Sequence, residues 1–149
     1  MKMQTCTKTF PDIPFAHRQH VHPGHCAFIH GHNWAFTFEF EGDTDEMDFI
    51  VDFGGPFMKQ LKADLTNDYD HKCLLNEDDD EGRSLIADYG RLFDVRFVKS
   101  CSAEGIAREL FSATAAKVSS ATNRRVRLIR VTVAEDSKNS ASVIDPEHE

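Results

Sequence analysis

The feature that most constrains the fold is a cluster of histidines that runs directly into an alternating stretch. Six of the eight histidines fall between residues 17 and 32. Residues 34–41, WAFTFEFE, then alternate aromatic or apolar side chains with small or polar ones, which is the period-2 pattern of a half-buried β-strand. The sequence therefore predicts that the histidine cluster leads into a β-sheet.

The cluster contains the donors of a metal site. His30 and His32 are separated by one residue, and a strand projects alternate side chains to the same face, so both imidazoles can bind one ion. A catalytic zinc site needs a third protein ligand and keeps one position open. His17 is the leading candidate for that ligand, and the residues alone leave three alternatives open: His20, His22 and His25.

Two further groups could move protons. Cys26 lies four residues before His30, and a thiol close to a metal and to cationic groups can act as a base or nucleophile; the alternative is a buried, inert cysteine. Asp70 is followed directly by His71, and a carboxylate beside an imidazole can orient it and tune its basicity. Taken alone, an Asp-His pair is more often simply a surface feature.

Two helices and a second strand are predicted after the alternating stretch. Residues 49–53, FIVDF, read as a short strand, and the Gly-Gly-Pro that follows predicts a helix beginning near Pro56. Ser102 is a plausible cap for a second helix, with Glu104 in its first turn. Glu104 could equally be a solvated charge.

The rest of the chain divides into a final strand and weaker segments. Valine, leucine and isoleucine alternate with basic residues from Val126, which predicts a strand that ends at Glu135. Residues 76–84 are acidic and predict a solvated loop, and the end of 85–99 is either a short strand or an extended arm. Residues 136–149 are expected to be partly ordered. The order of elements predicts an α+β domain with an antiparallel sheet and helices on one face.

Length, charge and cysteine spacing limit what kind of protein this can be. A chain of 149 residues fits one domain, here 1–149, and its formal net charge of -8 disfavours non-specific nucleic-acid binding. It has neither an apolar run long enough to cross a membrane nor the apolar centre of a signal peptide near its start. The four cysteines are scattered, which favours reduced thiols. We therefore expect a cytoplasmic protein.

Six motifs in order along the chain resemble one enzyme family. The chain resembles the family of 6-pyruvoyl-tetrahydropterin synthases and 6-carboxytetrahydropterin synthases through FAHR, CAFIHGHN, VDF, YDHKCLLN, SAEGIA and VTVAE. The resemblance implies a tunnelling fold, in which a four-stranded antiparallel sheet carries two helices between its second and third strands. It also implies assembly into barrels, as a homohexamer built from two trimers.

The resemblance also assigns roles to residues. His17, His30 and His32 match the zinc ligands of the family, and Cys26, Asp70 and His71 match its catalytic group. Glu135 matches the glutamate that anchors the pterin, and a carboxylate can accept hydrogen bonds from the ring N3–H and the 2-amino group together. Glu104 matches a helix-start glutamate that supports the same pocket. In such assemblies the site lies between subunits, so Cys26 and the Asp70-His71 pair of one site could come from different chains.

The reaction that the resemblance implies is a zinc-dependent lyase reaction on 7,8-dihydroneopterin triphosphate. We favour 6-carboxy-5,6,7,8-tetrahydropterin as the product, on a route to 7-deazaguanine compounds such as queuosine. The alternatives are the 6-pyruvoyl product and a non-catalytic, zinc-dependent pterin-binding protein. The chain departs from the family in its long segment 77–100, in VDFGGPF and in FPDIPFAHR. These departures bear on the pocket for the substrate's side chain and on the start of the first helix.

Overall fold

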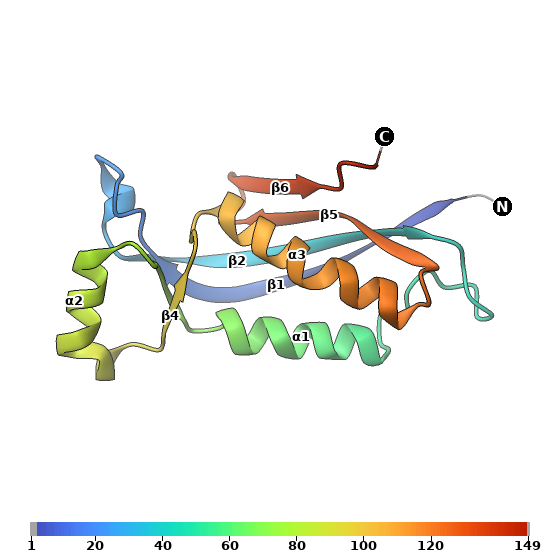
Figure 1. Ribbon diagram of the computed structural model, residues 1–149, viewed down its shortest axis with the longest axis horizontal. Coiled ribbons are helices and arrows are strands. Elements are labelled where there is room, and N and C mark those ends of the chain that lie inside the picture. Colours follow the sequence, from blue (N-terminus) through green and yellow to red (C-terminus); the bar gives the residue numbers. More distant parts are fainter. Residues whose placement is uncertain (1–2, 149) are drawn as a thin grey trace.

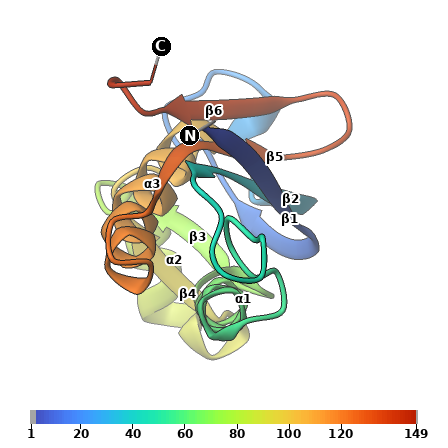
Figure 2. The same cartoon turned by 90° about the vertical axis from the view of Figure 1, so that its right-hand side faces the viewer.

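The computed structural model describes residues 3–148 and contains one sheet with helices packed beside it (Figures 1 and 2). The six strands are β1 (Gln4–His17), β2 (His30–Gly42), β3 (Cys73–Asn76), β4 (Val95–Val98), β5 (Val126–Ala134) and β6 (Ser140–Ile144). The three α-helices are α1 (Pro56–Tyr69), α2 (Asp80–Tyr89) and α3 (Ala103–Ala121). Within residues 3–148, no helix is both long and apolar enough to span a bilayer.

The sheet is mixed, with the strand order β4-β3-β1-β2-β5-β6. The strands β1, β2, β5 and β6 pair antiparallel, whereas β3 runs parallel to both β1 and β4. The prediction of a four-stranded antiparallel sheet with two helices is therefore wrong in strand number, strand direction and helix number. The difference arises because two short strands that lead out of helical segments extend the sheet beyond β1.

The core lies between the sheet and two helices. Alternate residues of β2 are fully buried: Trp34, Phe36, Phe38 and Phe40. This confirms the strand predicted over 34–41, because side chains two apart share a face and here that face is covered. Figure 2 shows α1 and α3 on the same side of the sheet, and the buried aromatic residues belong to the same core cluster as residues of both helices.

Both predicted helix starts are confirmed. Helix α1 begins at Pro56, which follows the extended residue Gly55, and proline is suited to the first helical position because its φ is already helical. Helix α3 is capped by Ser102, whose hydroxyl accepts a hydrogen bond from the amide of Gly105 at 3.0 Å. Such a cap satisfies an amide that would otherwise lack a partner in the first turn.

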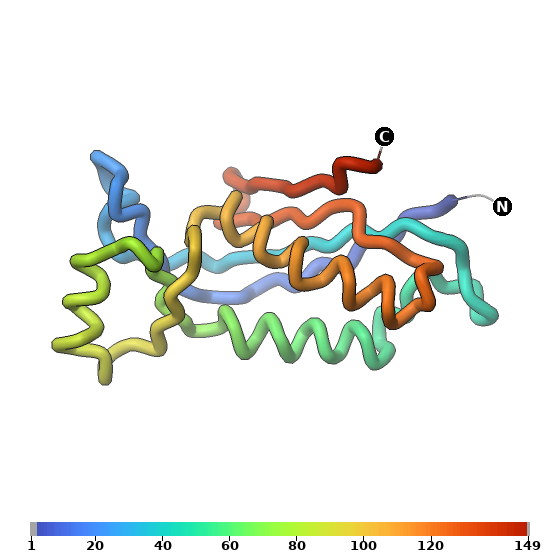
Figure 3. Tube along the Cα trace, viewed as in Figure 1, coloured from blue at the N-terminus to red at the C-terminus, as the bar shows by residue number. Residues whose placement is uncertain are grey.

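The segment predicted as an acidic loop, residues 76–84, instead carries the start of α2. Its helix begins there because the Asp79 carboxylate accepts a hydrogen bond from the amide of Gly82 at 2.9 Å, and acidic residues in the first turn suit the helix dipole. Figure 3 places α2 at the end of the molecule where the connection between β1 and β2 also lies. Beyond α2, the short 3-10 turn η2 (Gly90–Leu92) leads into β4, so the short-strand interpretation of that region is confirmed.

Three further differences from the sequence-based expectations concern strands. Residues 49–53 form no strand, because the Asp45 carboxylate accepts hydrogen bonds from the amides of Met47 and Phe49 and coils the chain into turns. The tail predicted to be partly ordered contains β6, which pairs antiparallel with β5. The strand β1 was not predicted at all, although the sequence did indicate that the histidine cluster adjoins a sheet. The strands β1 and β6 form by pairing with distant residues, which local patterns do not record, whereas the missing strand at residues 49–53 has a local cause.

Candidate metal centre and active site

Three histidines converge where β1 and β2 are paired. His17 is the last residue of β1 and His30 the first of β2, and the antiparallel register sets them opposite each other. His32 lies two residues further along β2, so it projects to the same face. Each of the three offers a ligand nitrogen, and these atoms all lie within 4.8 Å of one another. The predicted metal-ligand set is therefore assembled within one chain.

Hydrogen bonds orient two of the three imidazoles. Nδ1 of His17 lies 2.7 Å from the Cys101 carbonyl oxygen, and Nδ1 of His30 lies 2.7 Å from the Phe28 carbonyl oxygen. A carbonyl can only accept, so each Nδ1 donates and each Nε2 keeps a lone pair for a metal. Metal-binding histidines usually show this arrangement.

Buried nitrogens without partners also fit a metal. Nε2 of His17 and Nε2 of His32 are buried, and neither has a hydrogen-bond partner within residues 3–148. Burying a polar atom without a partner is costly, so such atoms call for an explanation. A metal bound by three imidazole nitrogens would satisfy both, and this donor set suits zinc with one position open.

The environment keeps His17 in the form that binds metal. Burial lowers the pKa of His17 to about 4, its hydrogen bond to the Cys101 carbonyl opposes that shift, and the nearby His30 and His32 add to it. His17 is therefore neutral at physiological pH, as a ligand must be.

Buried aromatic side chains pack against the histidine cluster. The Trp34 ring lies edge to face with His17 and His32, with centroid distances of 4.9 and 5.3 Å. Its indole Nε1 donates to the Phe15 carbonyl at 3.1 Å, and the Phe15 ring stacks on it at 4.3 Å. The imidazoles thus rest on side chains that cannot easily shift, which favours a preorganised site.

Glu135 also lies at the cluster. It directly follows β5, and one carboxylate oxygen is 3.8 Å from Nε2 of His17. Its backbone amide donates to the Asn139 carbonyl at 3.0 Å, which fixes the turn into β6. The structure thus brings the predicted pterin anchor next to the metal ligands.

Cys26 belongs to the connection between the two ligand-bearing strands. It lies in the short 3-10 turn η1 (His25–Ala27), and its side chain is exposed. Its carbonyl accepts a hydrogen bond from the Gln19 amide at 2.7 Å, so the connection closes on itself. Cys26 is not part of the metal-capable group found within residues 3–148, and neither are the other candidate ligands His20, His22 and His25.

The Asp70-His71 pair is formed as predicted. Asp70 caps the end of α1, and its carboxylate oxygen lies 2.7 Å from Nδ1 of His71. His71 adopts a φ of 60°, in the left-handed region that is uncommon for non-glycine residues, and its amide donates to the Pro14 carbonyl at 2.8 Å. Its side chain is 80% exposed, and it lines a shallow depression of about 480 Å³ together with His32. Such strain often marks a functional position.

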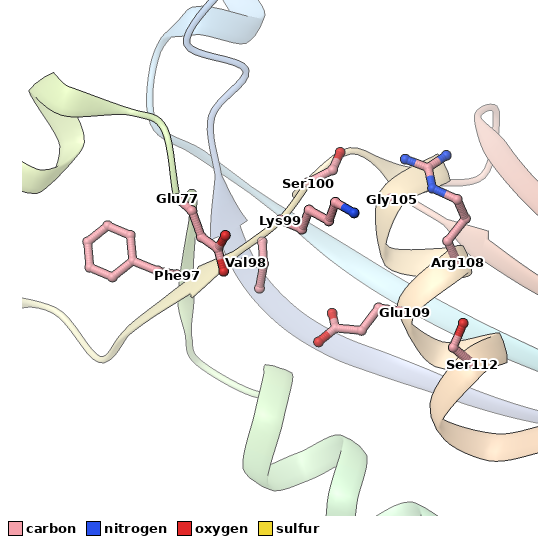
Figure 4. A pocket seen from close by; sticks show the side chains of 9 residues that line it. All are labelled: Glu77, Phe97, Val98, Lys99, Ser100, Gly105, Arg108, Glu109 and Ser112. Atoms are coloured by element: carbon pink, nitrogen blue, oxygen red, sulfur yellow. The ribbon is translucent and has the colours of Figure 1, made fainter. Parts of the chain in front are cut away.

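Glu104 is exposed in the first turn of α3 and is outside the histidine cluster. A larger cavity of about 660 Å³ lies between β4 and the start of α3, and none of the predicted site residues line it (Figure 4). Of its charged lining residues, Glu109 is already engaged by the Tyr69 hydroxyl and by Arg96. The cavity is therefore separate from the predicted chemistry.

Sequence reasoning missed the groups that hold the ligands in place. The carbonyls of Phe28 and Cys101 are backbone atoms, and no side-chain pattern points to them. Trp34 could have been found, because the alternation that places His30 and His32 on one face places Trp34 on the same face.

Comparison with known proteins identifies the family. The sequence profile described as 6-pyruvoyl tetrahydropterin synthase matches residues 5–146, nearly the whole chain. The chain belongs to this family. It is therefore a member of a pterin synthase family, and the recognition made from the six motifs is confirmed.

Curated relatives carry the name 6-carboxy-5,6,7,8-tetrahydropterin synthase. The protein of Rickettsia typhi is 32% identical over 89 residues, which covers 58% of this chain and 62% of that protein. The protein of Rickettsia bellii is 30% identical over 112 residues, covering 72% of this chain and 78% of that protein. The chain thus matches somewhat less than two thirds of the length of the first of these relatives.

Solved structures share the fold. An uncharacterized protein from Wolinella succinogenes superposes with a TM-score of 0.81 at 16% identity, covering 97% of this chain and 99% of that one. The 6-pyruvoyl tetrahydropterin synthase of Plasmodium vivax gives a TM-score of 0.67 at 17% identity, covering 94% of this chain and 97% of that one. At these identities the likeness establishes the α+β fold of the family.

Proposed function

We propose that this chain is a zinc-dependent lyase that converts 7,8-dihydroneopterin triphosphate to 6-carboxy-5,6,7,8-tetrahydropterin. The observation that carries the proposal is the cluster of His17, His30 and His32, whose ligand nitrogens lie within 4.8 Å of one another. Zinc bound there would polarise the hydroxyl groups of the substrate's side chain. The names of the Rickettsia relatives support the 6-carboxy product over the 6-pyruvoyl product.

The chain's own residues would bind the pterin and move protons. The Glu135 carboxylate would accept hydrogen bonds from the ring N3–H and the 2-amino group, with Glu104 supporting that pocket. Cys26 would take a proton from the side chain of the substrate, because it is exposed on the connection between the two histidine-bearing strands and is not needed to bind the metal. His71, oriented by Asp70, would act as the second proton carrier.

The assembly that we propose is a homohexamer made of two trimers. The 80% exposure of the His71 side chain supports it, because a catalytic imidazole is better placed in a closed site, which a neighbouring chain would provide. Analytical ultracentrifugation should show a hexamer, or at least a trimer. A fully active monomer would refute a site shared between chains.

The reaction itself is tested by incubating purified protein, loaded with zinc, with 7,8-dihydroneopterin triphosphate and identifying the pterin by mass spectrometry. We expect 6-carboxy-5,6,7,8-tetrahydropterin together with acetaldehyde and triphosphate. The 6-pyruvoyl compound would assign the chain to the other activity of the family. No turnover by a folded, metal-loaded oligomer would contradict both.

One distance favours a second candidate, a non-catalytic zinc-dependent pterin-binding protein. A carboxylate oxygen 3.8 Å from the His17 nitrogen could move to become a fourth protein ligand, and zinc sites closed by four protein ligands are structural. The variant Glu135→Gln distinguishes the two candidates. It should leave zinc affinity within about threefold if Glu135 anchors the pterin, and weaken it by about 10-fold or more if Glu135 closes the metal site.

A further inference from the structure

The first residues of the segment 77–100 make polar contacts with the connection between β1 and β2. We call residues 18–29, which join the ligands His17 and His30 and carry Cys26, the ligand loop. Its first residues meet residues 76–82, the end of β3 and the start of α2. Figure 3 shows the ligand loop in blue and α2 in yellow-green at the same end of the molecule.

The central contact is a buried ion pair. Nε of Arg18 lies 2.9 Å from a carboxylate oxygen of Asp79, with the Arg18 side chain 16% exposed and that of Asp79 1% exposed. The two groups are held by charge without an aligned hydrogen bond between these atoms. Buried charges depend strongly on their partners, so this contact should resist opening.

The same carboxylate holds the start of α2. The other oxygen of Asp79 accepts from the Gly82 amide at 2.9 Å and caps the helix. A Cβ at position 82 would lie 2.7 Å from the Asp79 carboxylate, so only glycine leaves room for it. One side chain therefore ties the helix terminus to the residue that follows a metal ligand.

Neighbouring contacts reinforce this connection. The Asn76 amide lies 3.2 Å from Nδ1 of His20, and its oxygen accepts from the Cys101 amide at 2.8 Å. The Cys101 thiol in turn donates to the Arg18 carbonyl at 3.1 Å, and the Cys101 carbonyl is the group that orients His17. Asn76 and Asp79 thus both contact the residues that directly follow His17.

We infer that Asp79 is a positioning residue, which acts through Arg18 to fix the ligand loop and with it the thiol of Cys26. The path is short: Arg18 precedes Gln19, whose amide is bonded to the Cys26 carbonyl at 2.7 Å. The role of Cys26 in this statement rests on the proposed function, whereas the ordering of the loop does not. The start of helix α2 would then hold the ligand loop in place.

The test compares Asp79→Asn with the matched control Glu81→Gln. Asparagine is of similar size and still caps a helix, but it removes the charge that pairs with Arg18. Glu81 also faces Arg18, at 3.5 Å, but its side chain is 88% exposed, so removing its charge should change little. Both variants alter one acidic residue in the same turn.

The first measurement is amide hydrogen exchange followed by mass spectrometry. In Asp79→Asn we expect exchange in residues 18–29 to be about 10-fold faster or more, while exchange in β2 residues 34–40 stays unchanged. Glu81→Gln should behave as the wild type. Equal acceleration in both regions would show a global loss of stability and would overturn a local positioning role, as would unchanged exchange in residues 18–29.

The second measurement separates positioning from general support. At saturating zinc, kcat of Asp79→Asn should fall about 10-fold with KM for the pterin and zinc affinity within about threefold of wild type, because His17 has its own hydrogen bond to Cys101. A parallel fall in zinc affinity would show that the pair supports the metal ligands instead. If Asp79→Asn does not fold, Arg18→Gln and Arg18→Lys replace it, and the lysine variant should restore part of the protection that glutamine loses.

These outcomes distinguish this inference from the proposed reaction. Faster exchange in the Asp79 variant, with no turnover by the wild type, would support the positioning role of Asp79 and contradict the proposed lyase reaction. Normal turnover by the wild type, with no change of exchange in the variant, would refute only the positioning role of Asp79.

Discussion

The candidate metal ligands and the proton-transfer candidates are held in different ways. His17, His30 and His32 lie on paired strands over the buried ring of Trp34, and backbone carbonyls orient two of them. Cys26 lies on an exposed connection. Strand pairing thus fixes the geometry that a metal requires, while the groups that would move protons depend on loops and on what packs against them.

The change with the largest expected effect is His30→Ala. Two imidazoles hold zinc poorly, so affinity should fall by at least about 100-fold, and turnover should disappear with the metal. Atomic absorption of the dialysed protein and a turnover assay measure the two effects, and His22→Ala is the control because His22 is outside the cluster. Full activity in metal-depleted His30→Ala would show that a metal bound by these histidines is not needed for the reaction.

A smaller effect is expected from Cys26→Ala, which removes a proton-transfer candidate from the connection between β1 and β2. Turnover should fall about 100-fold or more, the usual cost of removing a positioned proton carrier, while zinc content and the circular dichroism spectrum stay unchanged. Cys6→Ala is the matched control, since it removes a thiol outside the site. If Cys26→Ala turns over normally with zinc bound, another group is the base.

The cysteines themselves should report the difference between loop and core. Cys101 is buried, and burial raises the pKa of its thiol to about 11, so little thiolate is present at neutral pH. In the native protein, iodoacetamide should therefore modify the exposed Cys26 at least about 100-fold faster than Cys101, as measured by peptide mass spectrometry. Comparable rates would show that the core around His17 opens readily.

The smallest effect is a pH dependence of stability in the metal-free protein. The pKa of His17 is lowered to about 4 in the folded state, against about 6.5 when unfolded, so protonation favours the unfolded chain and stability falls as the pH drops through this window. At pH 5 the free energy of unfolding should be lower than at neutral pH by about 2 kcal/mol. Urea unfolding with a chelator present measures it, and His17→Asn should remove this part of the pH dependence. Identical pH profiles for the two proteins would contradict the lowered pKa.

Local chemistry made parts of the fold predictable. The alternation of residues 34–41, the proline at position 56 and the serine at position 102 each act within one strand or one helical turn, and all three predictions are confirmed. The same local reasoning failed for residues 49–53, where the Asp45 carboxylate coils an apolar segment that would otherwise suit a strand. It also failed at Asp79, whose capping role depends on the turn that follows.

By itself, the sequence determined that His30 and His32 share a face and that Trp34 shares it with them, because that follows from the period of a strand. It made His17 the leading candidate for the third ligand but left His20, His22 and His25 open as alternatives, and the family resemblance favoured His17. Only the tertiary structure decides among them: the register of β1 against β2 sets His17 opposite His30, whereas the other three stay in the connection. The physical reason is that register depends on burying one face of both strands together, which no residue of the cluster specifies alone.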